Sequence, residues 1–300
     1  NNKFYNMKKL FLLILIAGVS LKAAAQQIQT TAFPQIQGFM HNASFAGLGA
    51  TNFVGATYRT QWSEISGGPK TASLFGSFAM PSSKMGMSAL VYSDKTGPTS
   101  RTGLSVSFAK HIDFGNGSVL SLGIENKFQQ FRLDQEKLTA AIGTDPAIAN
   151  AKGGLNYDAG FGISFTNKNL QVGLSVAQLL ESELKNYSGS ASRTDVGKLY
   201  RHYYLTGAYS IKMNEDITMI PNLLLIYLPN TPAEFNAGAQ IIFKENIRVG
   251  ASASKNFSIN FGATLSKNFS VDYAFDLYSN DNVLNNLTAN EFMLRYHFKR

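Results

Sequence analysis

The chain has 300 residues, of which 44% are hydrophobic and only 15% are charged, and it contains 22 Phe, 13 Tyr and no Cys. The apolar and aromatic content excludes a disordered chain, and the missing cysteines exclude a disulfide scaffold or a thiolate metal site. Soluble domains average about 25% charged residues, so the low charge predicts a surface that largely faces lipid.

The N-terminal segment has the pattern of a secretory signal peptide. Met7-Lys8-Lys9 precedes an apolar run over 10–21, and Ala23-Ala24-Ala25 forms a small-residue cleavage site. The run of about 12 residues is too short for a membrane-spanning helix, which needs roughly 20. We therefore predict that 1–25 comprise a cleaved signal peptide and a few upstream residues.

The formal net charge of +8 becomes small once this segment is set aside. Four lysines and no acidic residue precede Gln26, which leaves 23 basic against 19 acidic residues. This excess is too small to predict a nucleic-acid groove. Gln26 also stands where a bacterial lipoprotein would carry its acylated Cys, so we expect no lipid anchor.

The rest of the chain alternates between apolar and polar residues. Apolar residues occupy every second position over 235–243 and over 271–277, and Gly, Asn, Gln and Asp are among the residues between them. A period of two places one set of side chains on each face of a β-strand. Each strand is therefore expected to have one apolar face and one face of small and polar residues.

About fourteen such segments follow one another. They lie at 52–64, 70–80, 85–92, 101–114, 118–131, 155–166, 169–180, 198–213, 217–228, 233–244, 246–254, 257–266, 269–279 and 290–299. An even number of strands of about ten residues is typical of a transmembrane antiparallel up-and-down β-barrel. We predict an all-β fold with this barrel over 52–300, preceded by an N-terminal periplasmic segment over 26–51.

The connections between these segments alternate in length. Tight turns of Gly, Asn, Asp and Lys alternate with longer loops, which are expected at 93–100, 132–154, 181–197, 229–232 and 280–289. Outer-membrane barrels have short periplasmic turns and long external loops, so the long loops are predicted to face the medium. A soluble β-sandwich is disfavoured because the strands carry little charge, and a propeller because no repeat of 40 to 45 residues is present.

The last segment ends in an aromatic residue close to the end of the sequence. Phe292, Leu294, Tyr296 and Phe298 share one face of it. This terminal alternation resembles the recognition signal read by the outer-membrane barrel assembly machinery. We predict that these four residues act as an assembly signal.

Several stretches resemble motifs of the PorP/SprF family of outer-membrane proteins, which are associated with type IX secretion and gliding motility in Bacteroidetes. The stretches are Asn42–Gly47, Tyr58–Trp62, Gly67–Thr71, Gly86–Asp94 with Gly97, and Asn290–Phe298. The resemblance implies a non-enzymatic barrel in the outer membrane of a Gram-negative bacterium. It also implies two partners, namely periplasmic components of the type IX machinery and a large secreted surface protein that the barrel helps to export or retain.

The motif at 58–62 contains candidate functional residues. Tyr58, Trp62 and their neighbour Phe53 suit an aromatic girdle at the membrane interface. Arg59 and Gln61 have the other parity from Tyr58 and are expected to face the lumen. A buried guanidinium needs a carboxylate or several carbonyl partners. Arg59, Gln61 and Trp62 are therefore candidates for a lumen network that stiffens the barrel, or for partner contacts.

Two further candidates lie in loops. Pro69 follows Gly67-Gly68, where Gly permits a positive φ and Pro fixes the entry into the next strand. Asp94 begins the Asp-x-x-Gly pattern that ends at Gly97. Both belong to the same candidate set for partner binding or the lumen network.

Signals for catalysis or metal binding are weak. The sequence has no Gly-x-Ser-x-Gly elbow, and His41, His111, His202 and His297 have no evident partner acid. Carboxylates in the loops 132–154 and 181–197 could bind Ca²⁺, but they lack EF-hand spacing. We predict no enzyme activity, no cofactor and no metal.

Two alternatives to a secretion component remain open. One is a passive porin or a hydrophobic-solute transporter, and the other is an outer-membrane lipid hydrolase with a Ser and a His at the lipid-facing rim. Porin constrictions are usually lined by charge rings, whereas the lumen parity here is expected to be Gly, Ser, Ala and Asn with few charges. This composition favours the secretion component, with outer-membrane lipid as its surroundings and no nucleic-acid partner.

Overall fold

The fold is one antiparallel β-sheet that closes on itself. The computed structural model describes residues 31–49, 52–142, 154–182, 199–229, 231–278 and 287–298. The predicted signal peptide lies outside these ranges. Within them, no helix is both long and apolar enough to cross a membrane.

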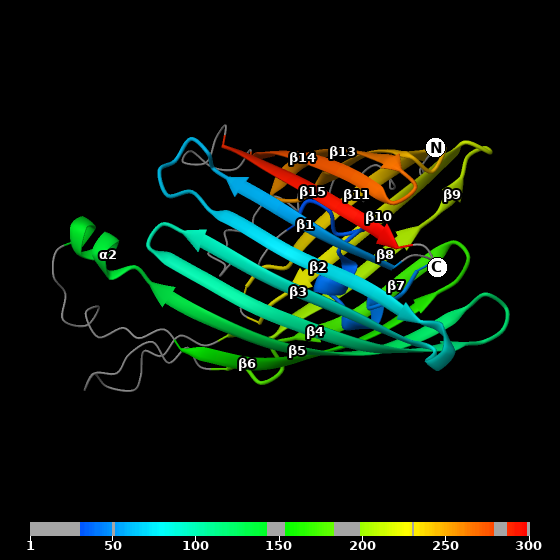
Figure 1. The fold of residues 1–300 in the computed structure, drawn as a ribbon, viewed down its shortest axis with the longest axis horizontal. Helices are drawn as coiled ribbons and strands as arrows, with labels where there is room; N and C mark the ends of the chain where they lie inside the picture. Colours follow the sequence, from blue (N-terminus) through cyan, green and yellow to red (C-terminus); the bar gives the residue numbers. More distant parts are fainter. Residues whose placement is uncertain are drawn as a thin grey trace, which may run out of the picture.

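The described part of the chain contains fifteen strands in one antiparallel sheet, and apart from β8 and β9 each pairs with the strands next to it in sequence (Figure 1). They are β1 (Asn52–Gln61), β2 (Lys70–Met80), β3 (Met85–Thr96), β4 (Thr99–Asp113), β5 (Val119–Leu133), β6 (Leu155–Thr166), β7 (Leu170–Ala177), β8 (His202–Tyr209), β9 (Ile211–Lys212), β10 (Ile217–Tyr227), β11 (Glu234–Phe243), β12 (Ile247–Ala253), β13 (Asn256–Ser266), β14 (Phe269–Tyr278) and β15 (Thr288–Phe298). Because β8 and β9 both pair with β10 and are separated only by Ser210, they are two parts of one wall strand. The prediction of fourteen antiparallel strands is confirmed.

The first and last strands close the barrel. β1 pairs with β15 over its whole length, from Asn52 opposite Phe298 to Gln61 opposite Ala289. Closure leaves no long unpaired strand edge, which a sheet in a membrane cannot expose to lipid.

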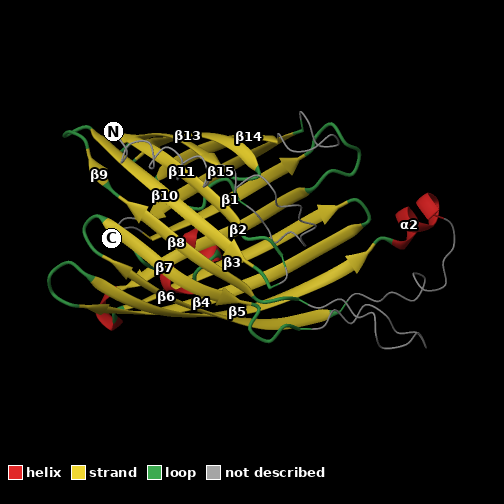
Figure 2. Ribbon diagram, turned by 180° about the vertical axis from the view of Figure 1, so that it is seen from behind, coloured by secondary structure: helices red, strands yellow, loops and turns green. Residues whose placement is uncertain are grey.

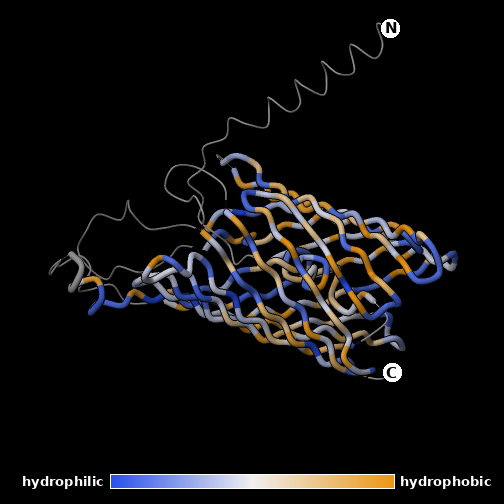
Figure 3. The backbone as a smooth tube through the Cα atoms, turned by 90° about the horizontal axis from the view of Figure 1, so that it is seen from above, coloured by the Kyte–Doolittle hydropathy of each residue, from blue (hydrophilic) through white to orange (hydrophobic). Residues whose placement is uncertain are grey.

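Alternation along each strand separates a lipid-facing exterior from a polar interior. On β5, Ile124 is 53% exposed on the outer wall, whereas the next residue, Glu125, is 8% exposed and points inward. The hydropathy of the backbone trace alternates in the same way around the wall (Figure 3). The exterior is the apolar surface that a bilayer would cover.

The connections also alternate in length, with one exception to the prediction. The described parts of the long connections, including helix α2 (Gln135–Ile142) and the loop between β1 and β2, lie at one end of the barrel (Figure 1). The predicted long loop at 93–100 is wrong, since β3 and β4 pair as far as Thr96 opposite Thr99. Gly97 has a φ of 55°, which permits the tight turn that joins them.

Residues 31–49 lie inside the barrel, where they form a segment that we call the plug. It contains two short 3₁₀ helices, η1 (Gly38–Met40) and η2 (Ala43–Phe45), which are enclosed by the wall strands (Figures 1 and 2). The sequence predicted a periplasmic segment over 26–51. The described part of that segment instead occupies the lumen. A third 3₁₀ helix, η3 (Pro81–Ser83), lies in the turn between β2 and β3.

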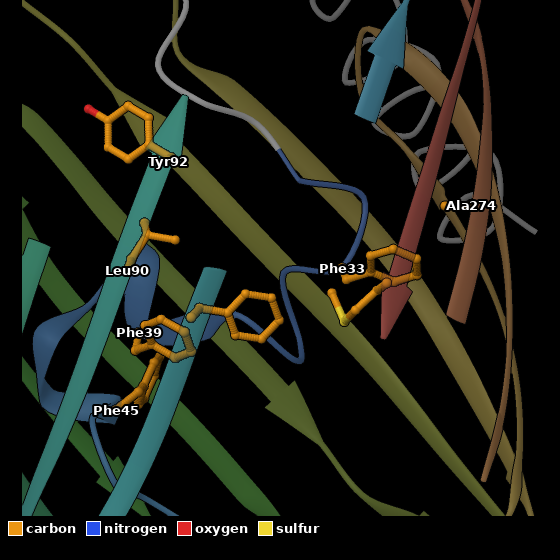
Figure 4. Close-up of a cluster of buried hydrophobic side chains, with 8 residues drawn as sticks. Phe33, Phe39, Phe45, Leu90, Tyr92 and Ala274 are labelled. Atoms are coloured by element: carbon orange, nitrogen blue, oxygen red, sulfur yellow. The ribbon is translucent and has the colours of Figure 1, made fainter. Parts of the chain in front are cut away.

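Apolar packing holds one side of the plug. Phe33, Phe39 and Phe45 are buried in a cluster with wall residues that include Leu90 and Tyr92 (Figure 4). Burial of a Phe side chain contributes roughly 1.5–3 kcal/mol relative to its exposure. The plug therefore has its own hydrophobic anchors in an otherwise polar lumen.

Glycines in the wall let the plug approach the opposite side closely. A Cβ at Gly162 would overlap the side chain of Asn42, and a Cβ at Gly123 would overlap the backbone of Ala43 and Ser44. The amide of Asn42 donates to the carbonyls of Ile163 and Leu174, each at 3.3 Å. Contact at this distance requires Gly on the strands that face η2.

Candidate functional site

Arg59 stands at the centre of a buried polar network on the seam where β1, β14 and β15 meet. Its guanidinium pairs with Asp276 at 2.5 Å and with Glu291 at 3.1 Å, and its side chain is 5% exposed. Gln61 donates to the hydroxyl of Tyr278 at 2.8 Å, and Arg59 reaches the same hydroxyl at 3.3 Å. One cation therefore faces two carboxylates inside the lumen, and both ion pairs are almost fully removed from water.

The seam network also binds the plug. The backbone N–H of Ala32 donates to Glu291 at 2.8 Å, and the hydroxyl of Thr31 donates to the other carboxylate oxygen at 3.0 Å. Hydrogen bonds to an ionised carboxylate are stronger than neutral ones. Glu291 thus connects the strand that closes the barrel to the segment that fills it.

A second network has the opposite excess of charge. Asp272 on β14 accepts from Arg295 on the adjacent strand β15 and from Arg248 on β12, one strand beyond β13, each at 2.9 Å. Two cations share one carboxylate here, whereas the Arg59 network has one cation and two carboxylates. The two clusters therefore have opposite excess charges, and both include residues of β14 and β15.

The prediction of a lumen with few charges is wrong. Among the described residues, eight charged residues are buried in the strands, all on their inner faces: Arg59, Glu125, Asp158, Arg248, Asp272, Asp276, Glu291 and Arg295. They come from six strands, with one or two on each, so no local cluster marks them in the sequence. Register brings them together, because antiparallel pairing places residues that are far apart in the sequence side by side.

The aromatic residues near Arg59 do not form one girdle. Tyr58 is 49% exposed on the outer wall. Phe53 has the parity of Arg59 and packs inward against Phe75, so its place in a girdle is a wrong prediction. Trp62 follows the end of β1 with a φ of 53°, where strand parity no longer applies, and its ring lies 6.2 Å from that of Tyr278.

Pro69 and Asp94 have separate positions. Pro69 is buried, and its carbonyl accepts the backbone N–H of Gln61 at 2.8 Å, which closes the loop between β1 and β2. Asp94 accepts from Thr71 at 2.8 Å and lies 3.8 Å from Arg101. The structure therefore gathers Arg59, Gln61 and Trp62 around Tyr278 but leaves Asp94 in another cluster.

The assembly-signal residues all lie on the outer face of β15. Phe292, Leu294, Tyr296 and Phe298 are between 40% and 59% exposed. Phe298 is opposite Asn52, the first residue of β1, so the aromatic end of the chain lies at the closing point of the barrel. Their role in assembly stays a prediction.

Two Ser–His contacts do not resemble a hydrolase site. His111 lies 2.8 Å from Ser121, and its other ring nitrogen faces the carbonyl of Ala46. His297 lies 3.1 Å from Ser270. Both serines are at most 1% exposed and neither is at the lipid-facing rim, so a lipid could not reach them. Among the described residues, no group of three or more His, Asp or Glu side chains could hold a metal ion.

A cavity of about 130 Å³ lies beside the Arg59 network. Asp276 and Tyr278 line it on one side, and Tyr204, Leu224 and Ile226 line another part. Nothing in the sequence marked Tyr204 and Leu224 as neighbours of Asp276, because the juxtaposition depends on the curvature of the closed barrel.

Solved structures with this fold are outer-membrane channels and related proteins. The Pseudomonas putida toluene transporter TodX aligns with a TM-score of 0.50 and 9% identity, covering 92% of this chain and 95% of that chain. The monoaromatic hydrocarbon channel CymD aligns with a TM-score of 0.51 and 11% identity over 92% and 94% of the two chains. The Acinetobacter baumannii outer membrane protein Omp33 aligns with a TM-score of 0.51 and 7% identity over 84% and 100% of the two chains. At these identities the likeness shows the fold alone.

Sequence comparison identifies the family. No curated protein matches the chain. The family described as type IX secretion system membrane protein PorP/SprF matches residues 22–296, which is nearly the whole sequence. This confirms the resemblance drawn from the motifs. The chain therefore belongs to the PorP/SprF family and is a β-barrel of the outer membrane.

Proposed function

We propose that this barrel is a non-enzymatic component of type IX secretion that supports the export or surface anchoring of a large secreted protein. The observation that carries the proposal is the plug, which fills the lumen and is bound to the wall on two sides. Glu291 holds its beginning, and Asn42 holds η2 against β6 and β7. A barrel filled in this way suits the binding and presentation of a protein better than free diffusion of solutes.

The family supports the same proposal. Family membership connects the chain to type IX secretion, and the partners would be periplasmic components of that machinery and one secreted surface protein. The family and the structural neighbours are secretion components, transporters or channels rather than enzymes. The exposed long-loop end of the barrel, which includes α2, offers a surface for a partner outside the membrane.

The second candidate function is a channel for hydrophobic solutes. It is favoured by the apolar part of the cavity, formed by Tyr204, Leu224 and Ile226. Two structural neighbours are named as a toluene transporter and a monoaromatic hydrocarbon channel. The plug opposes this candidate, since a solute would have to displace residues 31–49 to cross the membrane.

Deletion of the gene combined with surface proteomics tests the proposal. We expect one large secreted protein to disappear from the cell surface while other exported proteins remain, and plasmid expression of the intact protein should restore it. An unchanged surface proteome would contradict the proposal.

Planar-bilayer recording separates the two candidates. Intact protein is expected to give no steady channels, whereas a variant lacking residues 31–49 should conduct. Large steady currents from the intact protein would instead favour the channel.

A further inference from the structure

The cavity beside Asp276 lies between the plug and the long-loop end of the barrel. Its floor includes Ala32 and His41 of the plug, and its rim includes Leu228 and Lys255, which follow β10 and β12. The cavity therefore opens away from the turn end, toward the side where the long connections lie.

Small inward residues of neighbouring strands line one side of the cavity. Ser252, Ser258 and Asp276 are successive register partners across β12, β13 and β14, and all three line it. Because two of the three are serines, this part of the wall leaves space in the lumen. The space therefore depends on the sequence of several strands rather than on a single loop.

The two sides of the cavity differ in chemistry. Tyr204 and Leu224 are buried against each other, and Ile226 packs on them. Asp276 and Ser258 provide oxygen atoms on the other side. Small-molecule sites have this composition, with apolar walls and a few polar groups that fix the orientation of the ligand.

Several buried polar atoms of the residues that line the cavity have no hydrogen-bond partner among the described residues. They are Oδ1 of Asp276, Oδ1 of Asn236, Oγ of Ser258, Nδ1 of His41 and Nε of Arg59. The Asp276 side chain is only 2% exposed. An unmade hydrogen bond at a buried carboxylate is costly, so this oxygen is an acceptor for a bound donor.

The charged groups that line the cavity are mostly paired. Arg59 is engaged by Asp276 and Glu291, and Lys255 pairs with Glu234. Oδ1 of Asp276 is thus a carboxylate oxygen that still lacks a donor. Tyr278 and Tyr204 add aromatic rings to the lining, and aromatic faces attract cations.

The volume limits the size of the ligand. A dry cavity of about 150 Å³ holds a benzene molecule, and this cavity has about 130 Å³. We infer that it binds a small amphipathic amine, with a ring-sized apolar group against Tyr204 and Leu224 and an ammonium group at Asp276. The ammonium can belong to a free arylalkylamine or to the amino end of a peptide that begins with an aromatic residue.

The single tryptophan of the chain gives a direct readout. Trp62 is in ring contact with Tyr278, which lines the cavity. Purified full-length protein in nanodiscs is titrated with phenethylamine, ethylbenzene and phenylacetate while Trp62 fluorescence is recorded, and calorimetry provides a second measurement. We expect phenethylamine to bind at least tenfold more tightly than either of the other two compounds.

Two variants of one strand distinguish binding of the ligand in the cavity from its partition into lipid. Ser252→Leu fills the cavity from β12 and is expected to weaken phenethylamine binding at least tenfold. Ala251→Leu adds the same side chain to the outer face of the same strand and should leave binding unchanged. Asp276→Asn should remove the preference for phenethylamine over ethylbenzene. If that variant does not fold, the ligand series and Ser252→Leu still decide the question.

The source of the ammonium is tested with a peptide. Phe-Gly-Gly is compared with its N-acetylated form, and tighter binding of the free peptide than of phenethylamine would identify a peptide as the ligand. Equal binding of phenylacetate, an unchanged affinity in Ser252→Leu, or no binding of either amine at millimolar concentration would overturn the inference. None of these results depends on secretion, so they are independent of the surface-display test.

Discussion

Glu291, in the strand that closes the barrel, accepts a hydrogen bond at 2.8 Å from the backbone N–H of Ala32, in the segment that fills the lumen. The same carboxylate oxygen pairs with Arg59 across the seam. The acceptor for the plug is in place only when β1 and β15 have paired. Closure of the barrel and docking of the plug are thus connected through a single carboxylate.

Replacing Glu291 by Gln is expected to loosen the beginning of the plug. The change removes a charge from a buried ion pair and weakens the hydrogen bonds that Thr31 and Ala32 donate to residue 291. Arg59 keeps its ion pair with Asp276. We expect a loss of about 1–3 kcal/mol in docking free energy. Hydrogen exchange measured by mass spectrometry should rise over 31–37. Asp272→Asn alters the other seam network, which does not touch the plug, and serves as the control. Similar exchange in both variants would contradict the role of Glu291.

Gly162→Ala is expected to displace η2 from the wall. The new Cβ would overlap the side chain of Asn42, whereas a Cβ at Gly207 would meet nothing within 4 Å. Both changes replace a strand glycine by alanine, but Gly207 has the outward parity of Tyr203 and Leu205 on β8, so Gly207→Ala controls for the loss of a glycine without a contact to the plug. Faster hydrogen exchange over 38–46 should occur only in Gly162→Ala. The barrel itself should keep its heat-resistant mobility on a gel in both variants. Unchanged exchange in Gly162→Ala would show that the plug does not depend on this contact.

The strands were predictable because their signal is local. A period of two is visible in any stretch of five residues, and the wall of a barrel is built from such stretches. Turns such as the one at Gly115 were equally clear from their Gly and Asn content. The loop predicted at 93–100 failed because the alternating pattern beyond Tyr92 is polar on both faces, although β3 continues to Thr96.

The plug and the charged lumen were not predictable, because their signals are long-range. Phe33, Phe39 and Phe45 lie six residues apart, which by itself does not indicate a segment inside a lumen, and their partners are on strands far along the sequence. Arg248 and Asp272 are separated by 24 residues and meet only through the register of three strands. Trp62 departs from parity because its backbone has a positive φ, which a pattern of residue types does not reveal.

The orientation of the barrel in the membrane is a further prediction. The long connections should face the medium and the turn that contains Asn116 should face the periplasm, since short turns are periplasmic in outer-membrane barrels. An epitope inserted between β5 and β6 should be labelled on intact cells. An epitope at Asn116 should be labelled only after the outer membrane is permeabilised. The reverse pattern would invert the orientation.

Phe298→Ala is expected to reduce assembly more than stability. The Phe298 ring is 40% exposed on the outer face, where it contacts the rings of Phe78 and Tyr296, so its removal should cost the finished barrel about 1 kcal/mol or less. Outer-membrane levels should nevertheless fall several-fold, with an increase in degraded protein. Phe243→Ala is the control, because Phe243 is also 40% exposed but lies at the end of an internal strand. Equal levels of the two variants would contradict an assembly signal at the last strand.

Acidification is expected to weaken docking of the plug through His41. Burial against Tyr204 lowers the pKa of His41 from 6.5 to about 4, because the charged imidazolium loses its hydration. The docked state favours the neutral ring, so its stability is complete above pH 6.5 and is lost as the pH falls from 6.5 toward 4. At pH 5 the loss is about 2 kcal/mol, from roughly 1.4 kcal/mol per pH unit. Hydrogen exchange over 38–46, corrected for the intrinsic effect of pH, should therefore rise between pH 7 and pH 5. His41→Phe keeps the ring contact and removes the titration, so its corrected exchange should not change with pH; an equal rise in both proteins would exclude His41 as the cause.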